Sequence, residues 1–271
     1  MIYHLIYPFV DEYTVLNVVR YITFRTAYAS LTALVLSLLL GPWVIAKLRQ
    51  FQIGQYIQEE APKNHQGKVG TPTMGGILIV ISVMLPTLLW ADLTNLYIWV
   101  VLVSMGLFAF VGFIDDYLKV VNQRSLGLRV VEKLVLQGLI GLGIAFTLIA
   151  LKGMNLYNGS LSVPFFKRFT PDMDLLVLGA STFIPLILFT MLVIIGSSNA
   201  VNLTDGLDGL ASGLVIIAAS ALTVLTYVTG HADFATYLDL IKNTYASELT
   251  IFCGAMVGAT LGFLWYNSFP A

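Results

Sequence analysis

Seven stretches of this chain contain no Asp, Glu, Lys or Arg and are long enough to cross a membrane as helices. They cover residues 26–46, 69–91, 93–114, 134–151, 175–204, 209–232 and 249–271. A helix needs about 20 apolar residues to span the core of a bilayer. The stretches are continuously apolar, whereas membrane strands alternate. We therefore predict an all-α polytopic membrane protein with seven transmembrane helices, in which residues 1–271 form a single integral membrane domain.

The overall composition excludes several other classes of protein. Hydrophobic residues make up 58% of the chain and charged residues 11%, and the net charge is −1. A soluble domain carries about 25% charged residues, so this chain cannot coat a water-exposed surface. The near-zero net charge provides no basic field, and we expect no nucleic-acid partner. The lipid bilayer is the expected surrounding. Residues 1–21 contain Asp11 and Glu12 and resemble an interfacial segment more than a signal peptide.

Seven spans place the connections alternately on two sides of the membrane. The connections 47–71, 115–133 and 196–208 share one side with the chain end. That side carries eight of the 14 Lys and Arg residues, which predicts that it faces the cytoplasm and that the N-terminus is periplasmic. The segment 152–174 contains the turn-forming pair Asn158-Gly159 between short runs with β-forming residues. A small periplasmic hairpin is expected there.

Adjacent carboxylates follow the third stretch, in Asp115-Asp116-Tyr117-Leu118-Lys119. Two neighbouring acids at a membrane boundary repel each other unless a cation joins them. Magnesium commonly binds through one or two carboxylates together with substrate phosphates. The simpler interpretation is a solvated helix end in which Lys119 pairs with Asp115 at a spacing of four residues.

A row of amide and carboxylate side chains forms the second motif. Its members are Asn199, Asn202, Asp205 and Asp208, spaced by three residues. The apolar character of the preceding stretch ends near Ile195, and Gly196-Ser197-Ser198-Asn199 is expected to end that helix. A row with period three drifts around an α-helix, so a single functional face requires a break in the helix. Helix capping explains one or two of these residues, and we favour a binding or catalytic role for the row.

Two further motifs lie on the same predicted side. The segment from Lys68 to Gly76 includes Thr73, and its helix start with a nearby lysine suits an anion, although a capped helix start explains it equally well. The segment from Trp265 to Pro270 is typical of an interfacial aromatic belt and contains Asn267. The three histidines are scattered and predict no metal site.

Paired acids, an Asn/Asp row, an anion cradle and lysines thus converge at one membrane boundary. Such a site suits the joining of a water-soluble phosphate donor to a lipid phosphate, because phosphoryl transfer needs positioning and charge neutralisation. A secondary transporter would place its polar residues near the middle of the membrane, in two corresponding repeats. A seven-helix binding protein would not need this acidic row.

Four segments carry a resemblance to a known family. They are residues 70–76 (GTPTMGG), 112–119 (GFIDDYLK), 199–210 (NAVNLTDGLDGL) and 262–267 (GFLWYN). With them the chain resembles, over its whole length, the MraY family of phospho-N-acetylmuramoyl-pentapeptide transferases. The resemblance implies that undecaprenyl phosphate attacks UDP-N-acetylmuramoyl-pentapeptide, giving lipid I and UMP in peptidoglycan synthesis. It implies a bacterial inner-membrane enzyme that uses Mg²⁺, and it is compatible with a homodimer. The alternative is a related transferase that uses UDP-N-acetylglucosamine.

The resemblance also implies roles for individual residues. Asp115, Asp116 and Asp208 are the implied catalytic residues, and Asp115, Asp116 and Asn202 the implied metal ligands. The implied substrate-binding residues are Lys68, Thr73, Lys119, Lys133, Asn199, Asn202, Asp205 and Asn267. Which aspartate acts as a base stays open.

The family pattern continues beyond Ala271, the last residue of this sequence. In the family, a Met-Gly-Asp motif follows the Trp-Tyr-Asn segment, and about ten spans are usual. The resemblance therefore implies that a further metal-binding Asp lies beyond Ala271. We expect this sequence to be C-terminally truncated and the 271-residue chain alone to be inactive or nearly so.

Overall fold

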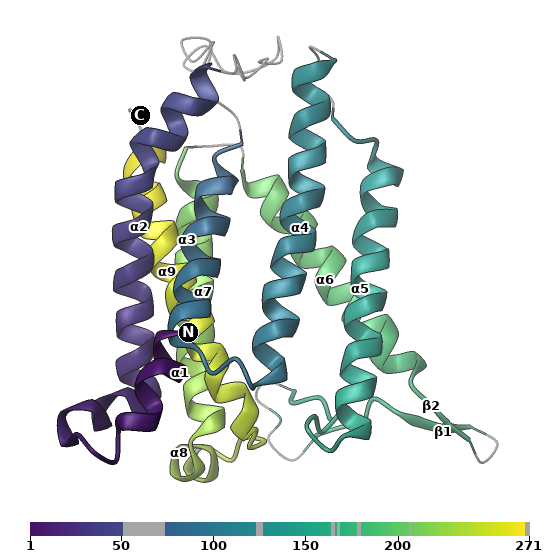
Figure 1. Cartoon of the computed structure of the whole chain (residues 1–271). Helices are drawn as coiled ribbons and strands as arrows, with labels where there is room; N and C mark the ends of the chain where they lie inside the picture. Colours follow the sequence, from purple (N-terminus) through teal and green to yellow (C-terminus); the bar gives the residue numbers. More distant parts are fainter. Residues whose placement is uncertain are drawn as a thin grey trace.

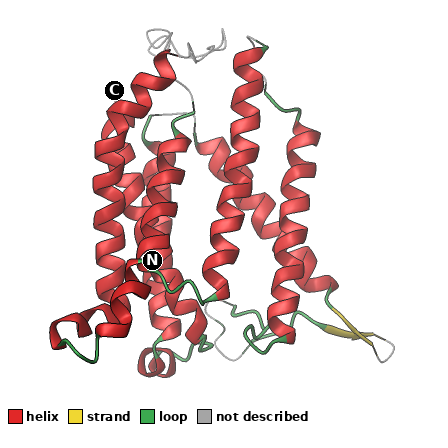
Figure 2. Ribbon diagram, in the orientation of Figure 1, coloured by secondary structure: helices red, strands yellow, loops and turns green. Residues whose placement is uncertain are grey.

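A computed structural model of the chain consists almost entirely of helices (Figures 1 and 2). It describes residues 1–50, 74–122, 127–163, 166, 169–177, 180–205 and 208–268. The longer helices are α2 (Ile22–Gln50), α3 (Gly76–Trp90), α4 (Leu96–Val121), α5 (Val130–Gly153), α6 (Ile184–Thr204), α7 (Leu210–Gly230) and α9 (Leu249–Asn267). Short elements are α1 (Ile2–Ile6), η1 (Tyr7–Phe9), η2 (Thr14–Arg20), α8 (Ala232–Tyr237), η4 (Thr244–Glu248) and the strands β1 (Leu175–Val177) and β2 (Ala180–Thr182).

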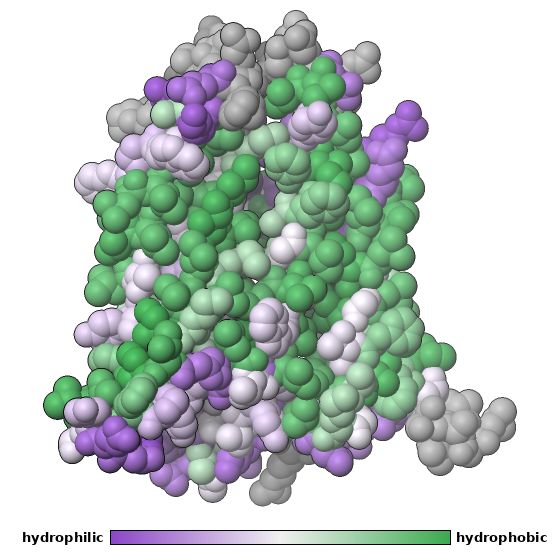
Figure 3. Space-filling model, viewed as in Figure 1, coloured by the Kyte–Doolittle hydropathy of each residue, from purple (hydrophilic) through white to green (hydrophobic). Residues whose placement is uncertain are grey.

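The predicted all-α polytopic fold is confirmed. Among the described residues, six helices are long and apolar enough to cross a membrane. The seventh expected span corresponds to α3, which has 15 described residues. Apolar side chains cover the middle of the face seen in Figure 3, and hydrophilic side chains collect toward its two ends. Large apolar side chains are exposed in this region, as expected where the solvent is lipid.

Three boundaries differ from the sequence prediction. The helix α6 continues through Gly196 and Asn199 to Thr204, because no Pro or strong cap interrupts it and neighbouring α5 satisfies its polar side chains. Its first residue is Ile184, since the preceding apolar residues form the strands. The paired acids lie inside the last turns of α4 rather than beyond them.

The hairpin is also displaced from its predicted place. Strands β1 and β2 pair antiparallel at 175–182, after the predicted segment 152–174. Within that segment the structure has one antiparallel bridge, between Ser160 and Asp172. Asn158 and Gly159 form no turn and lie directly before the bridge, so this part of the prediction is wrong, while the residues that follow Asp174 make the ladder.

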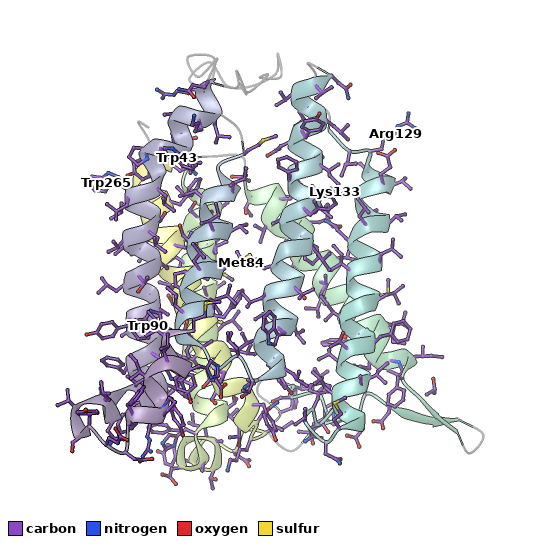
Figure 4. The ribbon with its side chains drawn as sticks, viewed as in Figure 1. Trp43, Met84, Trp90, Arg129, Lys133 and Trp265 are labelled. Atoms are coloured by element: carbon purple, nitrogen blue, oxygen red, sulfur yellow. The ribbon has the colours of Figure 1, made fainter. Side chains whose placement is uncertain are left out.

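Two ends of the bundle can be distinguished in Figure 1. The site end, uppermost in the view, carries the last turns of α2, α4, α6 and α9 and the first turns of α5 and α7. The far end carries α1, η2, α8 and the hairpin. This is the alternation predicted from the seven stretches. Trp43 and Trp265 lie toward the site end and Trp90 toward the far end (Figure 4), as in the aromatic belts of membrane proteins.

The core lies where α2, α3 and α9 meet. Small residues allow α2 and α9 to approach closely: a Cβ atom on Gly258 would collide with the backbone of Ser30. Close contact of backbones through small residues is a common way for membrane helices to associate. Helix α5 packs mainly on α6, and α4 contacts α5. Asn199 and Asn202 of the second motif therefore lie on α6, away from this core, and face α5.

A buried ion pair joins the helices at the far end. Arg25 donates to both carboxylate oxygens of Glu248, at 2.8 and 2.6 Å, and to the carbonyl of Trp90 at 3.4 Å. Glu248 also accepts from the backbone N–H of Asp92 at 3.0 Å, and the ring of Tyr3 lies 4.3 Å from the guanidinium carbon. Every charge in this cluster thus has protein partners.

Candidate active site

The paired acids of α4 share one lysine. Lys119 Nζ lies 2.7 Å from Asp115 Oδ2 and 2.9 Å from Asp116 Oδ1. Helical spacings of four and three residues bring the three side chains to one face at the site end. The pairing of Lys119 with Asp115 that the simpler, structural interpretation expected is present, and Asp116 joins the same pair. Side-chain exposure is 34% for Lys119 and 31% for Asp116, so both remain accessible to a ligand.

The connection that follows α4 folds back over Asp115. The backbone N–H of Leu128 donates to Asp115 Oδ1 at 2.8 Å. Gly127 permits this approach, because a Cβ atom there would collide with the backbone and carboxylate oxygens of Asp115. Both oxygens of Asp115 are therefore engaged, and its side chain is 16% exposed. Asp116 is the more available of the two acids for an incoming ligand.

Helices α5 and α6 present a second polar pair near these acids. Lys133 Nζ donates to Asn202 Oδ1 at 3.0 Å, and the positive charge of Lys133 also acts on Asp115. Lys133 lies near Arg129 at the site end (Figure 4). One turn deeper, the buried side chain of Gln137 contacts Ser198 and Asn199. Gln137 was not predicted from the sequence. The signal that could have found it is a single amide within the fourth apolar stretch, four residues after Lys133.

The Asn/Asp row is divided by the end of α6. Asn199 and Asn202 lie in the helix, Asp205 leaves it with ψ near 40°, and Asp208 precedes Gly209, whose φ is 75°. The break required for one functional face is therefore present. Partial burial raises the pKa of Asp205, and the nearby charges of Asp116 and Asp208 raise it further, while Lys119 lowers it. Asp205 and Asp208 thus belong to the same electrostatic cluster as Asp116 and Lys119.

Asn267 is less closely associated with this cluster. It ends α9, and its carbonyl oxygen lies beside Gly209 at the start of α7. The structure therefore brings together seven of the predicted residues, which are Asp115, Asp116, Lys119, Lys133, Asn202, Asp205 and Asp208.

Three positions used in the sequence prediction lie outside the described residues. Lys68 and Thr73 precede Met74, where the described chain begins again after residue 50. Ala271, beyond which the resemblance places a further metal-binding Asp, follows Ser268, the last described residue. The predicted anion cradle and the predicted additional metal ligand therefore stay predictions.

The oxygen donors of this cluster suit Mg²⁺ when phosphate supplies further ligands. Carboxylates and amide oxygens are hard donors, and magnesium usually retains water or phosphate ligands besides its protein ligands. The described residues contain no ready group of three His, Cys, Asp or Glu side chains that could hold a metal ion. The raised pKa of Asp205 reflects burial and repulsion by other carboxylates, and a bound cation would relieve the repulsion. The cluster therefore suits a metal ion whose coordination is completed by substrate phosphate.

Comparison with known proteins identifies the family. Residues 98–271 match the family model described as glycosyl transferase family 4. The chain is 52% identical over 280 residues to a phospho-N-acetylmuramoyl-pentapeptide-transferase of Koribacter versatilis, covering 100% of this chain and 74% of the relative. A protein of the same name from Acidobacterium capsulatum is 54% identical over 277 residues, covering 100% of this chain and 73% of the relative. Another, from Desulfatibacillum aliphaticivorans, is 52% identical over 272 residues, covering 100% and 72%. The chain therefore belongs to glycosyl transferase family 4 and, within it, to the phospho-N-acetylmuramoyl-pentapeptide-transferases.

Proposed function

We propose that this protein transfers phospho-N-acetylmuramoyl-pentapeptide from UDP-N-acetylmuramoyl-pentapeptide to undecaprenyl phosphate, forming lipid I and UMP in peptidoglycan synthesis. Identities of 52–54% over the full length of this chain to transferases of that name support it. The observation that carries the proposal is the position of Lys119, which bridges Asp115 and Asp116 beside Lys133 at the end of a membrane helix. Phosphate groups from water and from the lipid meet at such a boundary.

The reaction makes one phosphorus–oxygen bond and breaks another. An oxygen of the lipid phosphate attacks the phosphorus that bears the sugar, and the bond to the UMP phosphate breaks. Lys119 and Lys133 would attract the attacking phosphate and stabilise charge on the transferred group. Lys119 would have to exchange part of its pairing with Asp116 for phosphate oxygens. The lipid phosphate is largely ionised near neutral pH, because its second pKa lies near about 6. A carboxylate base is therefore not required for attack.

The acidic cluster would hold the donor diphosphate through Mg²⁺. The proposed protein ligands are Asp115, Asp116 and Asn202. Asp208 is a further proposed catalytic carboxylate. When bound, Mg²⁺ would supply positive charge to neutralise the diphosphate and the leaving group. Asn199, Asp205 and Asn267 remain predicted contacts to the donor, as do Lys68 and Thr73. Asp205 at the break after α6 is available for a hydroxyl or base of the nucleotide.

The site end is proposed to face the cytoplasm of a bacterium, where nucleotide donors are made. The bias of Lys and Arg, eight residues against six, supports this orientation in the inner membrane and a periplasmic N-terminus. Accessibility of single cysteines introduced near Arg129 and near Asp174 to a membrane-impermeant maleimide, in intact cells, tests it. Labelling near Arg129 from outside would reverse the orientation. Association into a homodimer stays a prediction.

A purified assay tests the proposed reaction directly. The protein containing these 271 residues is placed in lipid nanodiscs with undecaprenyl phosphate, Mg²⁺ and labelled donor. We expect lipid I and UMP in equal amounts and loss of both on chelation of Mg²⁺. Absence of product with intact donor binding would overturn the proposal. The 271-residue chain, measured in parallel, tests the expectation that it is inactive alone.

The alternative donor is tested in the same assay. UDP-N-acetylglucosamine at equal concentration should neither be consumed nor compete with the muramoyl donor. Its consumption at a comparable rate would favour the alternative, a transferase of N-acetylglucosamine 1-phosphate.

A further inference from the structure

Gln137 is a buried amide in the second turn of α5, and it is 1% exposed. Its Nε2 donates to Ser198 Oγ at 3.0 Å, and its Oε1 accepts from Asn199 Nδ2 at 2.8 Å. Asn199 Nδ2 also donates to the carbonyl of Ile195 at 2.8 Å. Both ends of the Gln137 amide are thus used by α6. An amide at this depth in a membrane helix is costly unless it is paired, which favours one arrangement of the two helices.

The polar contacts between α5 and α6 form two levels, one helical turn apart. Lys133 with Asn202 makes the outer level, and Gln137 with Ser198 and Asn199 makes the inner level. Residues 133 and 137 are four apart on α5, and residues 199 and 202 are three apart on α6, so each pair shares a helix face. A rotation or slide that breaks the inner level would also separate Lys133 from Asn202.

The rest of the contact between α5 and α6 specifies their register less sharply. Deeper in the membrane, Gly138 and Gly141 face Met191, and a Cβ atom added to either glycine would lie 3.6 to 3.7 Å from it. A flexible methionine against glycines packs well in several neighbouring registers. Hydrogen bonds from a buried amide have a definite length and direction and do not adapt in this way. Gln137 is therefore the feature that best determines how Lys133 and Asn202 face the acids of α4.

We propose that Gln137 is a positioning residue for the transfer reaction, which holds Lys133 and Asn202 in register through Ser198 and Asn199. This rests on the proposed function for its kinetic consequences but not for its geometric one. In this proposal Asn199 acts through α6, in place of the donor contact predicted for it above, and both hydrogens of its amide are committed within the protein.

The kinetic test compares Gln137→Leu with wild type in the lipid I assay. Removing both hydrogen bonds should lower kcat by about 10–100-fold, the effect of displacing a reacting group by a fraction of a helix turn. KM for the donor should stay within about twofold, because uniform binding is not removed. Thr147→Val on the same helix removes a hydroxyl whose hydrogen bond, among the described residues, is to the carbonyl of Gly143, and it should leave kcat unchanged. Unchanged kcat in Gln137→Leu would overturn the proposal.

A length exchange separates positioning from direct donor contact. Gln137→Asn shortens one amide by a methylene group and Asn199→Gln lengthens the other. Each single variant should lower kcat, and the double variant should recover most of the loss with an unchanged donor KM. If Asn199 instead touches the donor, the double variant would show a raised KM and no recovery, which would overturn the assignment.

A register measurement makes the test independent of the reaction. In a Cys253→Ala background, Lys133→Cys with Asn202→Cys is treated with a short bifunctional thiol reagent, and cross-linking is scored on gels. Adding Gln137→Leu should lower the yield, whereas Thr147→Val should not. An unchanged yield would overturn the positioning role. If wild type makes no lipid I while the cross-linking result holds, the proposed function has failed and the positioning role has not.

Discussion

The two ends of the helix bundle both carry charges at the membrane boundary, but they use them differently. At the far end, Arg25 and Glu248 have side-chain exposures of 3% and 10% and form a two-pronged pair supplemented by backbone groups. At the site end, Lys119 and Asp116 have exposures of 34% and 31%, and the carboxylates of Asp116 and Asp208 both repel that of Asp205. The first arrangement pairs both charges with protein groups and leaves only Arg25 Nε without a hydrogen-bond partner among the described residues of that cluster, whereas the second has an excess of negative charge.

This difference separates structural from functional charges in a membrane chain. Charged residues are scarce throughout this sequence, so scarcity alone does not distinguish a binding site from an ion pair that stabilises the fold. Burial of two opposite charges that pair with each other and with backbone groups marks a structural ion pair. Partial exposure with unbalanced like charges marks a site that gains by binding a cation or a phosphate-bearing ligand. The comparison yields three expectations with effects of decreasing size.

Loss of the far-end pair should have the largest effect, and it should be on stability. Glu248→Ala leaves the Arg25 charge buried and unpaired, which costs about 3–5 kcal/mol. Unfolding in mixed micelles measures this loss. The double variant Arg25→Met with Glu248→Leu should recover most of it, because no charge remains buried. Lipid I formation per folded molecule should be unchanged; a selective loss of turnover would break the distinction between the two ends.

The opposite pattern is expected for Asp116→Asn. Turnover should fall by about 10²–10³-fold, which corresponds to about 2.7–4 kcal/mol of transition-state stabilisation. The melting temperature should equal or exceed that of wild type, because the substitution relieves repulsion with Asp205. Steady-state kinetics and thermal unfolding of the same preparation check both parts. A large loss of stability with normal turnover would assign Asp116 to the structural class.

The smallest effect concerns a more exposed pair at the far end. Lys152 Nζ lies 2.6 Å from Asp174 Oδ1, and this hydrogen bond lowers the pKa of Asp174. The ionised carboxylate is therefore favoured in the folded state. Its contribution is present above the unfolded pKa of about 3.9 and is lost as pH falls through the lower folded value. Melting temperature between about pH 5 and pH 3 should fall slightly more in wild type than in Asp174→Asn. Equal slopes of melting temperature against pH in the two proteins would show that the pair of Lys152 and Asp174 does not contribute to stability.

The sequence predicted the members of the site better than their contacts. Asp115 and Asp116 were singled out as adjacent acids at a membrane boundary, and the contact of Lys119 with Asp115 followed from helical spacing, because interactions within one helix follow from its geometry. A break within the row was expected because a three-residue period cannot follow one helix face, but its position at Asp205 came only from the structure. Gln137 and the pair Arg25–Glu248 were missed, since each depends on residues 61 to 223 positions apart. The extension of α6 to Thr204 was missed because the polar residues from Gly196 to Asn199 suggest a helix end when their hydrogen-bond partners on α5 are unknown.

Two different physical effects thus separate what the sequence determined from what only the tertiary structure decided. Long uncharged stretches determined by themselves that the chain forms membrane helices and which connections share a side, because in lipid every backbone group must be bonded within its own helix. Only the tertiary structure decided which polar side chains meet: Lys133 with Asn202, Gln137 with Ser198 and Asn199, and Arg25 with Glu248. Helix rotation and register depend on side chains from different helices, and a hydrophobic pattern specifies neither.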